Sequence, residues 1–301
     1  MDKISIIIPC YNDAPYIEGC LESVCRQTIA DQLQFVLIDD GSTDDSADIA
    51  RRFLEKHCRL QQAKIISLPQ NKGVANARIT GIKEADGEYI MSFDADDWVD
   101  LAMCEKMLNK AKAEACDIVV CDYNSIKGDK VEIISECYKE PFLQQLILCT
   151  VTGSLCNKLV RAELFRRPDF RFPTHDFSED YVYSLQLAIM AKKIGYVPEP
   201  LYNYVHRSDS LVQSSSEEKI KKRYEDDMEN FRLDLDILKQ NSLLEKYREE
   251  IIAHKLKMKN SNKNCPELWR STFPELGREI FRSRYVSWRS RLAYIMNLIK
   301  I

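Results

Sequence analysis

The first 125 residues alternate short apolar runs with amphipathic stripes, and this alternation constrains the fold more than any other feature of the chain. Runs rich in β-branched residues predict strands over residues 4–8, 35–38, 64–68, 89–93 and 117–121. Apolar residues at helical spacing predict helices over residues 17–25, 43–57, 74–85 and 101–115. Strands joined through helices pair in parallel, so the sequence predicts an α/β fold with a mainly parallel, Rossmann-like sheet flanked by helices.

Polar residues follow four of these strands at the point where each strand ends. They occupy residues 9–13, 39–42, 71–73 and 94–97. Ligands of such sheets bind beyond the carboxyl ends of the strands, where these loops meet. Loops are ordinarily polar, so one such segment carries little information, but four in succession predict a binding site at this edge.

The segment after the fourth strand places three carboxylates, Asp94, Asp96 and Asp97, within four positions. Like charges this close raise one another's pKa, and a divalent cation is the usual means of keeping them ionised together. Such oxygen ligands suit Mg²⁺ or Mn²⁺, which in turn recruit phosphate oxygens. Aspartate is also a favoured turn and N-cap residue, so an Asp-rich turn that caps a helix beginning near Leu101 explains the spacing equally well.

Composition restricts the class of protein. At 301 residues the chain is long enough for one large domain with a smaller appendage, and its 45% hydrophobic and 30% charged residues are typical of a soluble globular protein. A net charge of -4 argues against nucleic-acid binding, and the lack of an apolar run of about 18 residues argues against a transmembrane helix. The apolar run at the N-terminus has only five residues and is too short for a secretory signal.

The chain has eleven cysteines and no Cys-x-x-Cys pair. This predicts reduced, buried thiols in a cytoplasmic protein and no structural zinc site.

The chain after residue 213 changes to a charged helical pattern, which predicts a helical C-terminal region over residues 214–301. Three serines, residues 214–216, are the predicted N-cap of a helix over residues 217–239. In the tail after Pro274, apolar residues share one helical face and arginines are interspersed. The apolar residues are Tyr285, Trp288, Leu292, Ile295, Met296 and Ile299, and the arginines are Arg282, Arg284, Arg289 and Arg291. Such a helix suits an anionic membrane surface, but apolar stripes more often face a protein core, and the sequence leaves both interpretations open.

Four segments together resemble the family 2 glycosyltransferases in order and spacing. These are residues 4–12, 36–44, 71–78 and 93–97. The resemblance implies the glycosyltransferase A fold, a nucleoside diphosphate sugar donor with UDP as the expected nucleotide, Mn²⁺ or Mg²⁺ as cofactor, and inversion at the anomeric carbon. It is closest to enzymes of bacterial cell-surface glycan synthesis. It implies a catalytic domain over residues 1–213, with a donor half at 1–125 and an acceptor half at 126–213.

The resemblance assigns the nucleotide pocket to residues at the first three strand ends. It implies that Pro9, Tyr11 and Asn12 lie at the pocket entrance. By the same resemblance Asp40 accepts a hydrogen bond from the base, and Lys72 is a candidate phosphate contact.

The Asp-x-Asp motif of the family matches Asp94 and Asp96. By this resemblance Asp94 lies towards the donor ribose, Asp96 binds the metal ion, and Asp94 is a second candidate ligand. Asp97 would support these two residues or cap the following helix. Arg78 is a candidate phosphate contact, although an arginine in a helix can equally pair with a carboxylate. His206 is a further candidate metal ligand, although a single histidine is more often structural.

Inverting transfer requires a general base, because an acceptor hydroxyl is a poor nucleophile while it keeps its proton. In the family this role usually falls to an acid of a downstream Glu-Asp pair, which here matches Glu179 and Asp180. We expect Asp180 to be the base, and Glu179 to orient the acceptor or to tune Asp180. The same pair suits the start of a helix over residues 181–192, and the two roles are compatible.

Two further segments resemble the family downstream of the donor half. Residues 202–210 resemble its closing segment, in which Arg207 or Ser210 would contact phosphate. Residues 157–161 resemble a segment that tryptophan often precedes, but Cys156 stands at that place here. This departure leaves the lining of the acceptor side open.

The sequence therefore predicts an enzyme that moves a sugar from a nucleoside diphosphate sugar to a hydroxyl of a glycan or a lipid-linked saccharide. We expect it in the cytoplasm, at the inner face of the plasma membrane if the tail binds lipid. The alternative is a catalytically silent glycan- or nucleotide-binding module of the same fold, and intact Asp94, Asp96 and Asp180 argue against it. No Gly-x-Gly-x-x-Gly follows the first strand, which disfavours a dinucleotide-binding oxidoreductase, and residues 9–12 are not the Gly-rich basic loop of a nucleotidyltransferase.

Overall fold

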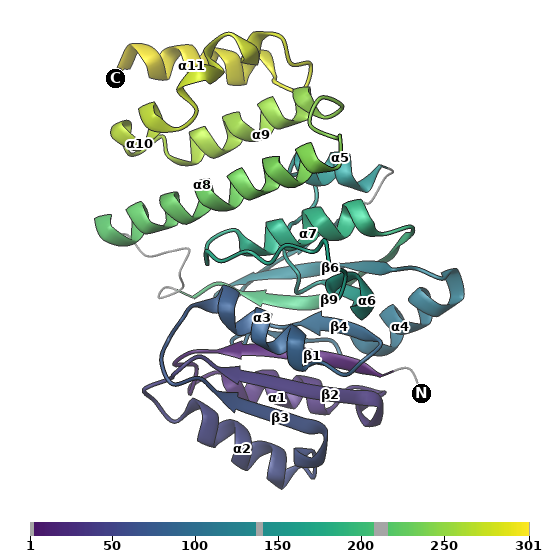
Figure 1. Ribbon diagram of the computed structural model, residues 1–301. Coiled ribbons are helices and arrows are strands. Elements are labelled where there is room, and N and C mark those ends of the chain that lie inside the picture. Colours follow the sequence, from purple (N-terminus) through teal and green to yellow (C-terminus); the bar gives the residue numbers. More distant parts are fainter. Residues whose placement is uncertain (1–2, 137–140, 208–215, 301) are drawn as a thin grey trace. The chain divides into compact units, whose positions relative to one another are not determined.

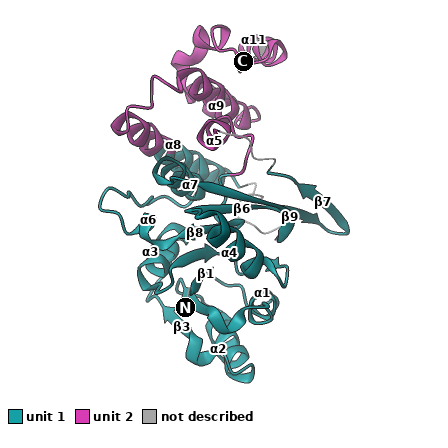
Figure 2. Ribbon diagram, turned by 90° about the vertical axis from the view of Figure 1, so that its right-hand side faces the viewer, with its two compact units in different colours: residues 1–138, 153–230 teal, residues 139–152, 231–301 magenta. Residues whose placement is uncertain are grey.

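The structure is a computed structural model that describes residues 3–136, 141–207 and 216–300 (Figure 1). The chain forms two compact units (Figure 2). Met1–Tyr138 and Gly153–Asn230 make up the first unit, and Lys139–Thr152 and Phe231–Ile301 make up the second. The predicted boundary between residues 213 and 214 lies outside the described residues, as do two serines of the predicted N-cap, so the predicted domain division stays a prediction.

Four parallel strands form one half of the sheet, in the spatial order β3-β2-β1-β4. They are β1 (Ile4–Cys10), β2 (Leu33–Asp39), β3 (Ala63–Ser67) and β4 (Tyr89–Ser92). The helices that alternate with them are α1 (Ile17–Cys25), α2 (Ser46–Lys56), α3 (Val74–Glu84) and α4 (Met103–Glu114), with short 3-10 turns at Ala30–Gln32 and Leu60–Gln62. These elements confirm the strands and helices predicted for this part of the chain.

Helices cover both faces of these strands, as the nearly continuous apolar sequence of β1 requires. Ile4, Ile6 and Ile8 of β1 lie in one core with residues of α1, α2 and α4. Ile7 points to the opposite face, where Gly81 of α3 packs so closely against it that a Cβ atom on Gly81 would overlap the isoleucine. The sheet is thus fixed between two helical layers, and the loops after its strands emerge together at one edge.

Five further strands complete the sheet in the order β4-β8-β6-β9-β5, with β7 paired to β6. They are β5 (Trp98–Val99), β6 (Ile118–Lys127), β7 (Lys130–Ile134), β8 (Lys158–Arg161) and β9 (Ile194–Val205). β6 and β9 are parallel, whereas β8 runs antiparallel to β4 and β6. The sheet is mainly parallel, as predicted. The sequence did not reveal β8, which has four residues, or β9, which contains Pro198 and Pro200 where its register with β6 shifts.

Two helices follow in the second half of the first unit, α6 (Ala162–Phe165) and α7 (Glu179–Met190). α7 confirms the helix predicted over residues 181–192 and begins two residues earlier, at the Glu-Asp pair itself. α8 (Glu217–Gln240) confirms the long charged helix and continues from the first unit into the second.

The second unit is helical, as predicted. Its other helices are α5 (Phe142–Ile147), α9 (Arg248–Ser261), α10 (Pro266–Ser271) and α11 (Trp288–Lys300), with 3-10 turns at Pro274–Gly277 and Glu279–Phe281. Its core contains a buried amine. The Lys259 ammonium donates hydrogen bonds to the carbonyl groups of Trp269 and Thr272, and it lies 4.2 Å from the Trp269 ring centroid. These bonds satisfy carbonyls at the end of α10, while burial lowers the pKa of Lys259.

The tail helix is packed on one side only. Tyr294 is buried against Trp269, with ring centroids 5.4 Å apart, whereas Trp288 and Leu292 are exposed. The interpretation of the apolar stripe as a core-facing surface therefore does not hold for the face that carries Trp288. The side chain of Ile299 lies outside the described part of the chain. Within the described residues, every helix is too short or too polar to cross a bilayer.

Candidate active site

The loops after β1 and β2 are locked to each other at the edge where the sequence predicts a nucleotide pocket. Asn12 has a left-handed backbone, with φ of +55°, which asparagine tolerates better than most residues. Its side-chain oxygen accepts a hydrogen bond from the Thr43 backbone amide at 2.8 Å, and its own amide donates to the Ser42 hydroxyl at 3.0 Å. Pro9 is buried in β1, and the Tyr11 ring beside this junction is exposed. The predicted pocket entrance is thus a rigid turn with one aromatic ring open to a ligand.

Asp40 fixes the loop before α3. Its buried carboxylate accepts hydrogen bonds from the backbone amides of Lys72 at 3.0 Å and Gly73 at 2.7 Å. Burial raises the pKa of Asp40, and the two amide hydrogen bonds oppose that rise. The side chain of Lys72 is exposed. The predictions that Asp40 accepts a hydrogen bond from a base and that Lys72 contacts phosphate stay predictions.

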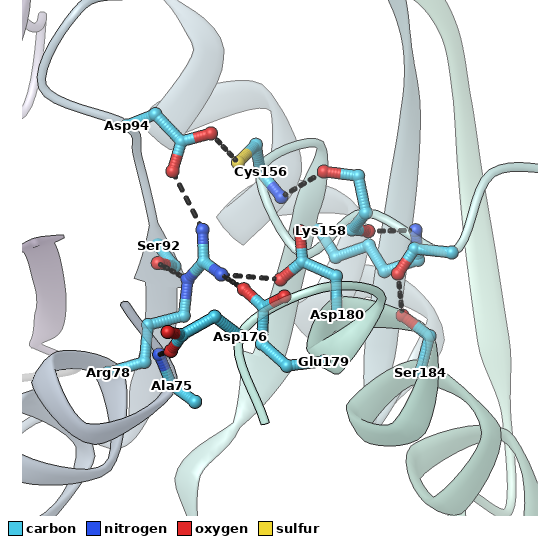
Figure 3. A network of polar contacts seen from close by, with 12 residues as sticks. Ala75, Arg78, Ser92, Asp94, Cys156, Lys158, Asp176, Glu179, Asp180 and Ser184 are labelled. Atoms are coloured by element: carbon cyan, nitrogen blue, oxygen red, sulfur yellow. Dashed lines mark hydrogen bonds and ion pairs between the residues drawn. The ribbon is translucent and has the colours of Figure 1, made fainter. Parts of the chain in front are cut away.

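One buried guanidinium joins residues from three distant parts of the chain (Figure 3). Arg78 of α3 forms ion pairs with Asp94 after β4 at 2.7 Å and with Asp180 of α7 at 2.9 Å. It also pairs closely with Glu179, and its Nε donates to the Ser92 hydroxyl at 3.1 Å. The Arg78 side chain is only 3% exposed. The Asp-x-Asp motif and the Glu-Asp pair, predicted as separate sites, therefore meet at a single cation.

The two acids of the Glu-Asp pair differ in accessibility. The Glu179 side chain is 7% exposed and that of Asp180 is 24% exposed. Burial raises the pKa of Glu179 well above its usual range, and the neighbouring charge of Asp180 adds to the rise. Burial also raises the pKa of Asp180, while the Arg78 guanidinium opposes that effect. Asp180 is therefore the acid of this pair that a substrate hydroxyl can reach.

Cys156 lies on the other oxygen of Asp94. Its thiol donates a weak hydrogen bond to Asp94 Oδ2 at 3.4 Å (Figure 3). Burial raises the pKa of Cys156 well above its usual range, so the sulfur keeps its proton as a donor. All ten cysteines in the described ranges are free thiols, as predicted, but Cys58 is exposed and Cys149 and Cys265 are only partly buried, so the prediction of burial is wrong for these three. Asp94 is thus held from two sides, by Arg78 and by Cys156.

Asp96 points to a different cation. Its carboxylate lies 2.8 Å from Arg207 Nε, and the same guanidinium is 3.4 Å from Asp13 and stacks 4.3 Å from the Tyr16 ring centroid. Burial and the repulsion of Asp94 raise the pKa of Asp96 to about 6, although Arg207 opposes the rise. The two carboxylates of the Asp-x-Asp motif are therefore neutralised separately, each by its own arginine.

Asp97 has a structural position. It is buried and accepts hydrogen bonds from the Tyr202 hydroxyl at 2.5 Å and the Val205 amide at 2.7 Å, both in β9. Burial, with repulsion from Asp94, raises its pKa to about 8. The alternative that Asp97 caps the following helix is wrong, since no side chain caps α4 and Asp97 binds β9 instead. Asp97 ties the Asp-x-Asp loop to the second half of the sheet.

The side chains present at this site determine whether it could bind a divalent cation. Among the described residues, no three His, Cys, Asp or Glu side chains are grouped to hold a metal ion. Mg²⁺ and Mn²⁺ are commonly bound by one or two carboxylates together with substrate phosphates, so Asp96 and Asp94 suit an ion that the donor diphosphate completes. His206 does not join such a group, since its Nε2 lies 2.8 Å from the Ser125 hydroxyl. Its role as a metal ligand stays a prediction.

Two further carboxylates lie at this edge, and the sequence analysis assigned a role to neither, although Asp13 is among the polar residues that it places after the first strand. Asp176 accepts a hydrogen bond from the Ala75 amide at 3.1 Å, at the first turn of α3, and it fills the space beside Gly73. Asp13 accepts from the Tyr11 amide at 3.0 Å as well as from Arg207. Neither role has a local signal in the sequence, because the partners of Asp176 and of Asp13 include residues from distant segments.

The comparisons with known proteins agree with this geometry. Residues 5–167, more than half of the chain, match the family model "Glycosyl transferase family 2". The chain is 31% identical over 259 residues to "Putative glycosyltransferase EpsH" of Bacillus subtilis (strain 168), an alignment that covers 82% of this chain and 72% of the relative.

Two solved structures share the fold. TarS residues 1–349 from S. aureus, in complex with UDP-GlcNAc, superposes with a TM-score of 0.67 at 21% identity, over 96% of this chain and 82% of that chain. The mannosyltransferase PcManGT from Pyrobaculum calidifontis, in complex with GDP-Man and Mn²⁺, gives a TM-score of 0.56 at 18% identity, over 98% and 85%. The architecture is the glycosyltransferase A fold with a helical C-terminal region. This chain belongs to glycosyltransferase family 2 and is a nucleotide-sugar-dependent glycosyltransferase.

Proposed function

We propose that this protein is a metal-dependent, inverting glycosyltransferase that uses a nucleoside diphosphate hexose or N-acetylhexosamine, with UDP as its nucleotide. The observation that carries the proposal is the Arg78 cluster. It places Asp94, on the predicted donor side, and Asp180, the predicted base, on one guanidinium. A transferase needs donor and acceptor groups in a fixed relation, because alignment of the reactants removes much of the entropic barrier.

The donor side supports binding of a nucleoside diphosphate. Asp96 and Asp94 would hold the divalent cation, which when bound would neutralise negative charge on the leaving diphosphate. Tyr11 and Asn12 flank the proposed nucleotide pocket, with Asp40 at its back. The Arg207 guanidinium neutralises Asp96 in the present structure. Arg207 would become available to a phosphate oxygen once a cation neutralises Asp96 instead, since the two cations compete for one carboxylate.

The acceptor side supports general-base catalysis. Asp180 would take the proton of the acceptor hydroxyl while that oxygen attacks the anomeric carbon and the bond to the diphosphate breaks. Attack from the face opposite the leaving group inverts the anomeric configuration. Burial raises the pKa of Asp180, which suits a proton acceptor, and the Arg78 guanidinium limits that rise. Glu179 is too buried to touch the acceptor and would set the position of Arg78.

The acceptor we propose is a hydroxyl of a glycan or lipid-linked saccharide in cell-surface polysaccharide synthesis, at the cytoplasmic face of the membrane. The similarity to EpsH and the fold shared with TarS support this class and do not select a sugar or a linkage. The identity of the acceptor would depend on the residues after about Val151, most of which lie beyond the family match to residues 5–167.

The direct test is a screen of UDP- and GDP-sugars by thermal shift, with Mn²⁺ and with a chelator, followed by an assay of donor turnover. A cognate donor raises the melting temperature in proportion to its affinity. Asp96→Ala should remove metal-dependent donor binding and turnover, whereas Asp129→Ala, at an exposed turn, should change neither. Donor binding without turnover under every condition would support the silent binding module instead.

A further inference from the structure

We propose that the exposed apolar face of α11 docks on an anionic lipid surface. We define the docking face as Trp288, Leu292, Ile295 and Met296. All four side chains are exposed, with exposed fractions between 38% for Ile295 and 68% for Trp288. Large apolar side chains that gather in one exposed patch usually mark an interaction site.

The helix presents this face in a fixed orientation within the second unit. Residues 288, 292, 295 and 296 recur at helical spacing and so share one side of α11. The other side is held by the unit's own core, where Tyr294 packs on Trp269. The Arg291 guanidinium adds hydrogen bonds to the carbonyls of Ile280 at 3.1 Å and Ser283 at 2.7 Å. The docking face therefore cannot turn inward without breaking these contacts.

The charge around the docking face selects the partner. Residues 278–300 contain five arginines and one lysine against one glutamate, a net charge of +5 in a chain that carries -4 overall. Arg282 and Arg289 are exposed, and the Arg289 guanidinium lies 5.6 Å from the Trp288 ring centroid. An apolar face with tryptophan, bordered by arginine, matches the boundary between acidic headgroups and acyl chains.

A second copy of the chain suits this face less well. Two docking faces in contact would bring the arginines of both copies together, and such like charges repel across a desolvated interface. A transmembrane role is excluded for the helices of the described ranges, because none is long and apolar enough. Binding in the plane of the membrane surface satisfies both the apolar side chains and the arginines.

The experiment measures binding of the full chain to vesicles without donor or acceptor, so its result is independent of the proposed transfer reaction. In a Trp98→Phe background, Trp288 is the exposed tryptophan and Trp269 is buried. We expect its emission to shift to the blue with vesicles that contain about one third phosphatidylglycerol. Phosphatidylcholine vesicles should give little shift. Raising the salt from about 0.05 M to about 0.5 M should weaken binding severalfold, because salt screens the arginines.

Matched variants distinguish docking through this face from nonspecific adsorption of exposed apolar side chains to vesicles. Trp288→Ser with Leu292→Ser should reduce co-sedimentation with anionic vesicles about tenfold or more, since both side chains supply buried apolar area on docking. Val131→Ser with Ile133→Ser, which changes two exposed apolar residues of β7, should leave co-sedimentation unchanged. Unchanged melting temperatures would show that both double variants fold. Equal binding by the two double variants, or a dimer that Trp288→Ser with Leu292→Ser dissociates in the absence of vesicle binding, would overturn the proposal.

Discussion

At the scale of single residues, the candidate site contains more carboxylates than positively charged side chains, so each arginine pairs with more than one of them. Arg78 pairs with Asp94, Glu179 and Asp180, and its guanidinium is buried. A buried charge is stable only while its oppositely charged partners remain. Removal of one partner commonly lowers the free energy of unfolding by about 3–5 kcal/mol. Arg78 therefore both links these segments and opposes the effect of burial on the pKa of the proposed base.

Replacement of this arginine is the first prediction. Arg78→Gln should lower the free energy of unfolding by about 3–5 kcal/mol, because three carboxylates lose their common partner. It should also lower the transfer rate by about 100-fold, since a misplaced catalytic group has an effect of that size. Urea unfolding and a transfer assay measure the two effects. Arg26→Gln, which breaks the exposed pair with Glu22, is the control and should change stability by less than about 0.5 kcal/mol.

The pH dependence of donor binding is a second prediction at this scale. The pKa of Asp96 is raised to about 6, and a protonated carboxyl does not bind a cation. The affinity for donor with Mn²⁺ should therefore be constant well above pH 6 and should fall as the pH drops through that value. Calorimetric titrations at a series of pH values measure this. Asp96→Asn should bind the donor with Mn²⁺ weakly at every pH. If the wild-type affinity does not change with pH in this range, Asp96 is not the metal ligand.

At the scale of elements, β9 closes the site although it lies about a hundred residues after the Asp-x-Asp motif. The bond between the Tyr202 hydroxyl and Asp97 connects them, and the two partners are 105 positions apart in the sequence. This strand carries Tyr202 and ends next to His206 and Arg207, so its anchoring decides where the Asp96 partner lies. The contact between the Asp-x-Asp loop and β9 therefore belongs to the site as much as to the sheet.

Removal of that hydroxyl tests the junction. Tyr202→Phe should lower the free energy of unfolding by about 1–2 kcal/mol, because a buried carboxyl loses one of its two hydrogen-bond donors. Chemical denaturation measures the change. Tyr11→Phe, at an exposed ring, should leave stability unaltered. Equal stability of wild type and Tyr202→Phe would show that the hydroxyl bond does not hold β9.

The elements also show what a sequence can and cannot reveal. The donor half was predictable because each strand and helix has its own local apolar period, and because four polar loops must meet at one sheet edge. The Arg78 cluster was not, since Glu179 lies 101 residues away and no local pattern records a contact between them. β8 was missed for a related reason. It is four residues long and enters the sheet between strands that precede it in the sequence.

At the scale of the whole molecule, the two compact units differ in composition and in chemistry. The first unit contains the sheet and the proposed active site, and the second is helical and contains the docking face. His254 of α9 lies in the core of the second unit, 5.1 Å from the Phe231 ring centroid. Burial lowers the pKa of His254 from 6.5 to about 4, so the fold holds the imidazole neutral.

This shift predicts a loss of stability in acid. The unfolded chain binds a proton near pH 6.5 and the folded chain only near pH 4, so the stabilisation is complete above 6.5 and is lost as the pH falls to 4. The melting temperature of the transition that reports the second unit should fall over this range. His254→Gln should weaken that dependence. His175→Gln, in the first unit, should leave it unchanged, and an unaltered slope in His254→Gln would contradict the assignment.

The central claim is that Asp180 is the general base, held beside the donor site by Arg78. Asp180→Asn keeps the size of the side chain and removes its basicity, so the measurement is turnover and donor affinity in the same variant. We predict that turnover falls by about 10²–10⁴-fold, the usual contribution of a general base, while the affinity for donor with Mn²⁺ stays within about threefold. Glu179→Gln is the matched control and should lose less turnover. Turnover of Asp180→Asn close to that of the wild type would contradict the account.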